Sequence, residues 1–551
     1  MCFHKWRNRH SIGQISGIAF LTGLAVPVLA QQPSTTDAPA APAVVNTPSP
    51  PDSIEIKLQA ALDILREKGI LADKEYQAAL QRRQAAASPA DSSPEPPPAL
   101  TTTTTTTTTK TPTMPPPPPP PPSPSPPPPQ TASPARAVMG KFDVSLYGFV
   151  ELDGIYDSTQ SYNELSGNGL LARPGTFAAE HGRTLATVRN SRLGVKVQTP
   201  EWHRMSLHGA LEFDLLGNQP PTATEIQTFV NDTFRVRHAF VELKTSWVNV
   251  LIGQAWQLFG WQSFFHPAAV GIQGMPGQVY SRAPQLRLSH CFHAGGMQVE
   301  AALAAARSPQ RDSAFPDGQA GIRLSFDRWK GMHSTGATST AVDSAAIGVS
   351  GALRRFSLAV PTAVPPATAD TNSTMGWGMS VDAVLPIVPV KERRAGALTV
   401  NGSFVRGTGI ADFYTGLTGG VGFPASPPLG KGYTPGFTDI DPGIALYTTD
   451  LRLAMVDWQS FLIGLQLYLP PRGKLWVASN FSQMDSANIT DFTAATASGV
   501  FVRSRWADVN LFADVLPGLR IGAEYSWFWQ LYNDDVEAQN HRFQLSAFYI
   551  F

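Results

Sequence analysis

Cysteine is nearly absent from this 551-residue sequence. Cys2 lies in an N-terminal segment that we expect to be removed, which leaves Cys291 without an intramolecular partner. The sequence therefore excludes a disulfide framework and a cysteine-based metal site. Metal ligands at useful spacing are missing as well, so we expect neither a metal nor a cofactor.

Net charge and long apolar runs are also missing. The 42 Lys and Arg residues balance 42 Asp and Glu residues, which leaves no basic surface for nucleic acid. Beyond residue 30, no run reaches the roughly 18 apolar residues that a membrane helix needs. The mean hydropathy of −0.10 is typical of a soluble protein. That average does not exclude a transmembrane β-barrel, because alternate residues of its strands face a polar lumen.

Residues 1–30 have the pattern of a cleaved export signal. Lys5, Arg7 and Arg9 form a positive head, 12–29 are largely apolar, and Ala30 is a small residue suited to cleavage. A membrane anchor is the alternative, but the apolar run is interrupted and polar residues follow it. We therefore expect the mature protein to lie outside the cytoplasm.

Three segments of distinct composition follow the signal. Residues 31–53 and 88–137 are rich in Pro, Thr, Ala and Ser, cannot bury a core, and are predicted to be disordered linkers. Proline runs favour polyproline II, so 88–137 is either a stiff spacer or a passive insertion. Between them, 54–87 has apolar residues at helical spacing on both sides of Gly69, which predicts a small helical hairpin. Self-association, contact with the periplasm or cell wall, and a plain spacer role are all open for it.

From residue 138 the chain alternates between apolar and polar residues. In 142–154, Val144, Leu146, Val150 and Leu152 share one face, as period-2 geometry requires of a half-buried strand. The last strand, 541–551, ends on the same alternation, which fits either a soluble sandwich or the closing strand of an outer-membrane barrel. The repeated alternation and the export signal favour the barrel, with the last strand paired to the first and Phe543, Leu545 and Tyr549 toward lipid.

Connections of unequal length support this prediction. Short turns alternate with long polar loops, as they do in outer-membrane barrels. The short turns are expected near 199–204, 245–248, 293–296, 386–396, 470–473 and 515–518, and the long loops at 157–183, 217–232, 258–283, 408–445, 484–503 and 531–539. We predict an all-β, antiparallel, up-and-down transmembrane barrel over 138–551 with about sixteen strands, and eighteen as the alternative.

Several segments of this region, taken together and in order, resemble the DcaP-like outer-membrane porins. They are Leu146–Asp157, Ser191–Lys196, Arg235–Glu242, Gly253–Trp256, Arg282–Arg287, Pro316–Arg323 and the stretch from Val509 to Phe551. The resemblance implies a trimeric outer-membrane channel for dicarboxylates and similar small anions. Where that family more typically carries a coiled-coil segment, this sequence has the hairpin and the Thr/Pro-rich linker.

Arginine is the residue type that points to a pore site. Guanidinium groups bind carboxylates bidentately, and a ring of them selects anions. The candidate pore-lining or solute-binding residues are Arg192, Lys196, Arg235, Arg237, Arg282, Arg287, Arg323, Glu212 and Asp214. The acidic members, with other lumen carboxylates, either leave an excess of positive charge or neutralise the arginines and leave an unselective pore.

Two local features carry alternatives. The loop 258–283 is rich in aromatics and glycine, so it either folds into the barrel and narrows the pore or caps the surface. In the strand near 233–244, Arg235 and Arg237 share parity with Val241 and Leu243. A β-bulge near His238 would turn the arginines inward; otherwise they lie at the rim, beyond the lipid.

The sequence thus predicts an outer-membrane porin that is not an enzyme, a passive channel for small hydrophilic solutes with a preference for anions. Its N-terminal segment would be periplasmic and its partners outer-membrane lipid and further copies of the chain. Two other classes remain open: an envelope tether in which the barrel anchors the hairpin and linker, and an outer-membrane enzyme. No hydroxyl nucleophile beside a histidine supports the enzyme.

Overall fold

The computed structural model describes residues 135–139, 141–166, 170–217, 233–271, 275–308, 315–360, 370–389, 394–414, 443–448, 452–492 and 500–551. The expected export signal 1–30, the segment 31–53, the hairpin 54–87 and residues 88–134 of the second linker lie outside these residues. Among the described residues, no helix is long and apolar enough to cross a membrane.

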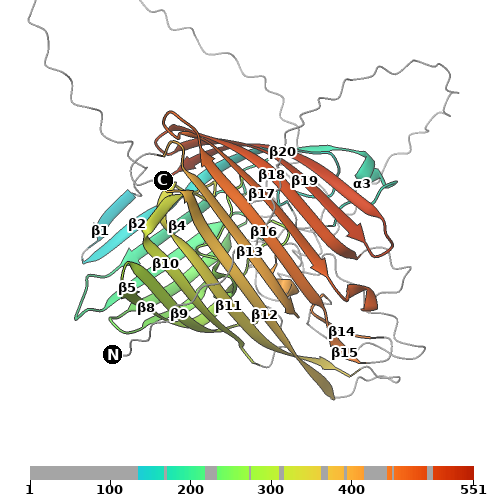
Figure 1. The fold of residues 1–551 in the computed structure, drawn as a ribbon, viewed down its shortest axis with the longest axis horizontal. Helices are drawn as coiled ribbons and strands as arrows, with labels where there is room; N and C mark the ends of the chain where they lie inside the picture. The colour runs from blue at the N-terminus through green and yellow to red at the C-terminus, as the bar shows by residue number, and fades with distance from the viewer. Residues whose placement is uncertain are drawn as a thin grey trace, which may run out of the picture. The chain divides into compact units, whose positions relative to one another are not determined.

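Within the described residues, sixteen strand positions form one closed antiparallel barrel (Figure 1). Each position is hydrogen-bonded to its neighbours in chain order, and β20 closes the ring on β2. β3 and β4 together occupy one position, because both pair with β2 on the same side. The prediction of sixteen strands is confirmed, and the alternative of eighteen is not.

The strands of the barrel are β2 (Phe142–Asp157), β3 (Arg183–Thr187), β4 (Arg192–Gln198), β5 (Ser206–Asp214), β6 (Arg235–Lys244), β7 (Asn249–Trp256), β8 (Arg282–Ala294), β9 (Met297–Ala306), β10 (Asp317–His333), β11 (Ala341–Ala359), β12 (Thr371–Val388), β13 (Leu398–Thr408), β16 (Asp457–Tyr468), β17 (Leu475–Ser486), β18 (Phe501–Leu516), β19 (Leu519–Tyr532) and β20 (Glu537–Ile550). The loops carry α3 (Phe177–Glu180), the 3-10 turns η2 (Phe259–Trp261), η3 (Ala411–Phe413) and η4 (Ile489–Phe492), and the small ribbon β14 (Ala445–Tyr447) and β15 (Leu453–Met455).

Side chains alternate between an apolar outer face and a polar interior. On β2, Val150 and Leu152 are exposed on the outside, whereas Glu151 and Asp153 are buried inside. β20 repeats the pattern, with the predicted outward residues Phe543, Leu545 and Tyr549 exposed. This arrangement matches a barrel that meets hydrocarbon on its outer wall and water in its lumen.

The first and last strands are joined at the end of the chain. The N–H of Phe551 donates to the carbonyl of Gly148 at 3.1 Å, and the N–H of Gly148 donates back at 3.0 Å. A side chain at Gly148 would lie 2.2 Å from the carbonyl oxygen of Arg192, so only glycine fits at this seam. The predicted pairing of the last strand with the first is confirmed.

A short strand, β1 (Ala135–Met139), continues this edge of β2 beyond the end of β20. Its register runs from Ala135 opposite Leu146 to Met139 opposite Phe142. Strand structure therefore begins inside the segment 88–137, which composition had indicated to be linker. Composition does not reveal β1, because backbone hydrogen bonds hold such an edge strand and no hydrophobic pattern is needed.

The anomalous parity of β6 has the expected cause. Between β5 and β6 the register shifts, so that Glu212 is opposite His238 while Phe213 is opposite Val236. The extra residue is Arg237, which lets both Arg237 and His238 face inward while Val236 remains exposed outside. The predicted bulge near His238 is confirmed.

The two ends of the barrel differ in their connections. One end, called here the short-turn end, carries 199–205, 245–248, 295–296, 334–340, 389–397, 469–474 and 517–518. The opposite, long-loop end carries 158–182, 215–234, 257–281, 307–316, 360–370, 409–456, 487–500 and 533–536. This is the asymmetry that the sequence predicted, with 334–340 as one further short turn.

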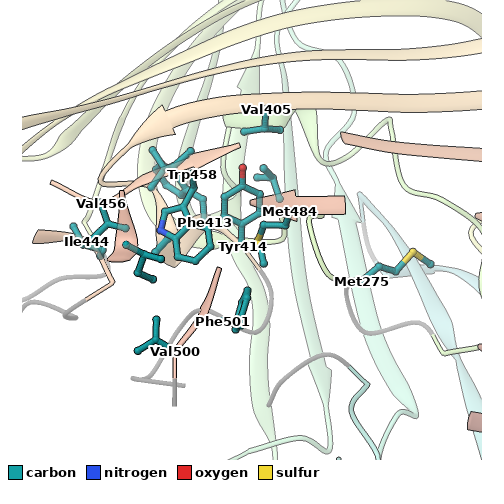
Figure 2. Close-up of a cluster of buried hydrophobic side chains, with 14 of the residues drawn as sticks. Met275, Val405, Phe413, Tyr414, Ile444, Val456, Trp458, Met484, Val500 and Phe501 are labelled. Atoms are coloured by element: carbon teal, nitrogen blue, oxygen red, sulfur yellow. The ribbon is translucent and has the colours of Figure 1, made fainter. Parts of the chain in front are cut away.

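Apolar side chains from the long loops pack inside the barrel toward the long-loop end. Figure 2 shows Phe413 and Tyr414, which follow β13, packed beside Trp458 of β16. Val456 and Ile444 of the same connection join this cluster and are fully buried. The cluster therefore fills part of the lumen near the long-loop end.

Candidate functional site

The loop 257–281, between β7 and β8, folds into the barrel. Its base is closed by Gln257, whose N–H donates to the carbonyl of Ser281 at 3.1 Å and whose Nε2 donates to the Ser281 hydroxyl at 2.6 Å. From that base the loop extends through η2 and returns by way of Met275 to Tyr280. We call the loop 257–281 the crossing loop.

The first half of the crossing loop packs on β10 and β11. The N–H of Phe259 donates to Gln319 Oε1 at 3.0 Å, and the Trp261 indole donates to the carbonyl of Val349 at 3.1 Å. Gly321 and Gly348 make room for the indole, because a Cβ at either position would lie within 3 Å of it. These contacts seat Trp261 against the wall.

The second half is held by the opposite wall. Asn480 of β17 donates its amide to the carbonyl of Ala268 at 2.7 Å, and the N–H of Val270 donates to Asn510 Oδ1 at 2.8 Å. The N–H of Gly271 donates to the Glu524 carboxylate at 2.8 Å. The loop therefore crosses the lumen from β7 and β8 to β17–β19. Of the two predicted arrangements, the inward one is confirmed and the surface cap is not.

Releasing the tip of the crossing loop is expected to widen the pore. The double variant Asn480→Ala with Asn510→Ala removes two hydrogen bonds to the loop backbone, together worth about 2 kcal/mol. We expect a larger single-channel conductance and more current noise in planar bilayers. Asn401→Ala removes an amide from the neighbouring wall that has no hydrogen-bond partner among the described residues, and serves as the control. Equal conductance in the double variant and the control would contradict the tethering role.

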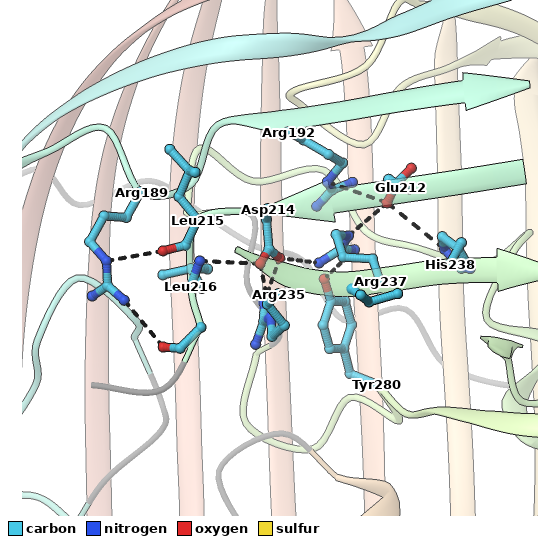
Figure 3. Close-up of polar contacts among 12 residues, drawn as sticks. Arg189, Arg192, Glu212, Asp214, Leu215, Leu216, Arg235, Arg237, His238 and Tyr280 are labelled. Atoms are coloured by element: carbon cyan, nitrogen blue, oxygen red, sulfur yellow. Dashed lines mark hydrogen bonds and ion pairs between the residues drawn. The ribbon is translucent and has the colours of Figure 1, made fainter. Parts of the chain in front are cut away.

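Three of the predicted arginines, Arg192 of β4 and Arg235 and Arg237 of β6, lie together around Glu212 and Asp214, with Tyr280 of the crossing loop beside them (Figure 3). Arg237 is fully buried and donates from Nε to Glu212 at 2.7 Å and from Nη1 to Asp214 at 2.9 Å. Its Nη2 also donates to the Tyr280 hydroxyl at 3.2 Å. Arg235 binds Asp214 bidentately, at 2.9 and 2.6 Å. Arg237 thus ties the wall of the barrel to the loop.

Arg192 and one further arginine of this group, Arg282, make no short hydrogen bond to a carboxylate. Arg192 lies 3.7 Å from Glu212, beyond hydrogen-bonding distance, and stacks over Phe149. Arg282 stacks over Trp256 and Tyr280, and its Nη1 has no hydrogen-bond partner among the described residues. Four guanidinium groups therefore face only two carboxylates. We call Arg192, Arg235, Arg237 and Arg282, with Glu212 and Asp214, the arginine cluster.

The remaining predicted residues lie apart from this cluster. Lys196 is exposed and sits over the Tyr147 ring, whereas Arg287 donates to Gln285 Oε1 at 3.1 and 3.0 Å and to the carbonyl of Trp256. Arg323 pairs with Glu300 at 2.6 Å on the other side of the crossing loop. The structure therefore brings together six of the nine predicted residues in the arginine cluster.

Sequence reasoning missed several interior groups. Tyr280 and Trp256 complete the arginine cluster, yet as aromatics beside a loop they gave no signal of a site. Buried ion pairs also went unnoticed, although strand parity would have found the inward arginines. They join Arg354 to Asp317 and Asp412, Arg542 to Asp157, and Arg189 to Glu164.

A set of carboxylates lies on the wall that the loop tip covers. Asp153 accepts hydrogen bonds from Asn190 and Gln544, Glu524 accepts from the loop, and Asp508 accepts from Asn480. Glu151 lies among them, and all four side chains are buried. In contrast, the Arg192 side chain is 16% exposed and that of Arg235 is 33% exposed. Arg192 and Arg235 are therefore more exposed than the four carboxylates beneath the loop tip.

Tyr280 is placed to respond to pH. Burial opposes ionisation of the phenol, but Arg237, Arg282 and Arg192 outweigh it and lower the pKa of Tyr280 to about 7. His266 lies in the same loop, and burial with the same arginines lowers its pKa to about 3, so it stays neutral near pH 7. The phenol is thus the loop group of this cluster that titrates near neutrality.

Anion preference is expected to fall as the pH rises through about 7. Deprotonation of Tyr280 places a negative charge against Arg237 and Arg282, which cancels part of the positive excess. Reversal potentials measured between pH 6 and pH 8, on the order of one unit on each side of that pKa, report the change. Tyr280→Phe keeps the ring and removes the titration, so its reversal potential should stay flat. If the reversal potential of Tyr280→Phe changes with pH as much as that of the unmodified protein, another group is responsible for the titration.

Metal chemistry has no support in the part of the chain that the structure describes. No group of three His, Cys, Asp or Glu side chains there is arranged to hold a metal ion. The arginine cluster instead presents hydrogen-bond donors, which suit carboxylate or phosphate oxygens.

Comparison with solved structures finds outer-membrane proteins. The outer membrane channel DcaP of Acinetobacter baumannii has a TM-score of 0.52 and 16% identity, covering 75% of this chain and 99% of that chain. The anion-selective porin from Comamonas acidovorans has a TM-score of 0.43 and 11% identity over 74% and 100% of the two chains. OmpT of Vibrio cholerae has a TM-score of 0.41 and 11% identity over 76% and 100%.

The similarity to DcaP shows a shared fold and confirms the fold that the sequence resemblance implied. The other two similarities are too weak to support an argument about this chain. No protein-family profile matches the sequence, and no curated protein matches it.

Proposed function

We propose that this chain, which has the fold of the DcaP outer-membrane channel, is itself an outer-membrane porin. It would let small hydrophilic solutes diffuse passively, with a preference for anions such as dicarboxylates. The N-terminal segment would lie in the periplasm, at the short-turn end of the barrel. The homotrimer implied by the resemblance belongs to the same proposal, and crosslinking in native membranes would measure it.

The arginine cluster carries the anion preference. Beside the crossing loop, Glu212 and Asp214 make their short contacts with Arg237 and Arg235, whereas Arg192 is 3.7 Å from Glu212 and Arg282 Nη1 has no hydrogen-bond partner among the described residues. A passing carboxylate can replace water at these guanidinium groups and form charge-assisted hydrogen bonds.

Planar-bilayer recording of the purified full-length protein tests the proposal. We expect stable single-channel conductance and, in a salt gradient, a reversal potential of the sign set by anion flow. Succinate as the permeant anion addresses the dicarboxylate part. Absence of conductance would contradict the porin function. A reversal potential whose sign indicates cation flow would contradict only the anion preference.

The tether function makes a different prediction for the same protein. Deleting residues 31–137 removes the expected linkers and hairpin but leaves nearly the whole barrel. A porin lacking this segment keeps its conductance, whereas a tether loses attachment to the rest of the envelope. Conductance and co-sedimentation with cell-wall fragments, measured on the same deletion, separate the two functions.

A further inference from the structure

A polar cavity of about 490 Å³ opens on the other side of the crossing loop from the arginine cluster. Ser263, Phe264 and His266 of the loop form one side, and Arg323 and the segment 333–346 form the other. Gln298 borders it close to the turn 295–296, so the cavity faces the short-turn end. Its volume lies within the range of roughly 300–1,000 Å³ that small-molecule sites occupy. We call it the hydroxyl cavity.

Hydroxyl groups dominate its polar lining. They come from the loop, from β10, from the β10–β11 connection and from β11, and include Ser263, Ser325, Thr335, Thr338, Ser339 and Ser344. Thr335 and Thr338 bond each other at 2.8 Å, and Ser325 accepts from Arg323 at 2.8 Å. Among the described residues, no side-chain hydrogen bond is recorded for Ser263, Gln298, Ser339 or Ser344. These groups keep donors and acceptors for a ligand.

The charges around the cavity do not favour an anion. Both Nε and Nη2 of Arg323 donate to Glu300, at 3.2 and 2.6 Å, so its charge is balanced. Asp343, with its side chain 53% exposed, adds a carboxylate beside His333 at 3.3 Å. An anion therefore gains little here, whereas a ligand with many hydroxyls can both donate to Asp343 and accept from the hydroxyl groups.

An aromatic side chain gives the cavity one apolar contact. Phe264 is 38% exposed, and Arg323 stacks over its ring at 3.6 Å. The exposed remainder of the ring presents its electron-rich π surface to the C–H bonds of a ligand. Hydroxyl groups around a partly apolar platform match the alternating C–H and O–H surfaces of a sugar or polyol.

We propose that the hydroxyl cavity is a second solute site of this channel, which binds neutral polyhydroxylated molecules of sugar or polyol type. The inference rests on the proposed porin function for its biological meaning, but binding itself does not depend on conductance. Solutes entering from the short-turn end would meet this site before the crossing loop.

Sucrose is the probe that tests the site. In planar bilayers, sucrose added on the short-turn side is expected to reduce the ion current more than a polyethylene glycol of equal hydrodynamic size. The double variant Gln298→Ala with Ser344→Ala should raise the half-blocking concentration roughly 30-fold, the loss expected for two hydrogen bonds. Ser373→Ala removes an exposed hydroxyl of β12 away from the cavity and should match the unmodified protein.

Isothermal titration calorimetry of sucrose with the full-length protein in detergent measures the same site without conductance. Sucrose binding that the double variant weakens supports the proposal, whatever the bilayer result. Block no stronger than that by the polymer, together with no calorimetric binding, overturns it. Tighter binding of succinate than of sucrose, lost in the same double variant, would overturn the neutral class of ligand. A protein that conducts but does not bind sucrose loses only this site, so the two proposals fail separately.

Discussion

Replacing Arg192 and Arg282 by alanine is expected to lower the anion-over-cation permeability ratio by roughly 30-fold. Each guanidinium group contributes about 1 kcal/mol to an anion at about 4 Å in water, and two such losses correspond to that factor. Glu212, the carboxylate 3.7 Å from Arg192, keeps its shorter contact with Arg237 at 2.7 Å, so the double variant leaves this acid paired. The reversal potential in a salt gradient measures the change.

The control for this variant is an arginine outside the lumen. Arg355→Ala removes the same charge from an exposed position on β11, where the side chain reaches Ser373. Its permeability ratio should equal that of the unmodified protein. If Arg355→Ala and the double variant shift the ratio equally, the effect comes from total charge and the arginine cluster has no selective role. Unchanged ratios in both would show that the carboxylates of the lumen neutralise the cluster.

Replacing Arg542 by alanine is expected to destabilise the barrel by about 3–5 kcal/mol, the usual cost of breaking a buried ion pair. Arg542 of β20 binds Asp157 of β2 bidentately, with both distances 2.8 Å and both side chains fully buried. It also donates to the carbonyl of Asn163 at 2.6 Å, so one side chain holds the closing seam and the loop above it. The folded barrel should convert to the unfolded form on electrophoresis gels after heating to a lower temperature.

Two comparison variants sharpen this test. Arg503→Ala breaks a partly exposed ion pair with Asp485, which is expected to cost no more than about 1 kcal/mol. Arg542→Ala combined with Asp157→Ala should be more stable than Arg542→Ala alone, because no buried carboxylate is left without its partner. A double variant as unstable as the single one would show that packing at the seam, and not the unpaired charge, causes the loss.

The sequence alone predicted most of the barrel wall, that is, which strand residues face outward and which face inward. Period-2 alternation is a local property, so Val150, Leu152, Phe543 and Tyr549 could be assigned to the outer face from their neighbours alone. The irregular parity of Arg235 and Arg237 even indicated the bulge, because only an extra residue restores an inward arginine next to outward valines. The inward direction of Arg192, Glu212 and Asp214 followed from the same rule.

Parity could not decide which inward groups meet. Arg323 shares the interior with Arg237, but Glu300 neutralises it on the other side of the crossing loop. Arg282 and Tyr280 face each other because the loop returns to its base there, and this depends on contacts of Ala268, Val270 and Gly271 with strands more than 200 residues away. Such long-range pairings leave no periodic trace in the sequence.

The sequence by itself determined the fold class and the faces of most side chains, because alternation and loop length are encoded locally; it favoured sixteen strands over eighteen, and the pairing in the structure settled the number. Only the tertiary structure decided that the crossing loop enters the lumen and that Arg192 and Arg282 are the arginines of the cluster that make no short hydrogen bond to an acid. It also decided that a hydroxyl-lined cavity lies on the other side of that loop. The physical reason is that charge balance and cavity shape depend on distances between segments that closure of the barrel brings together.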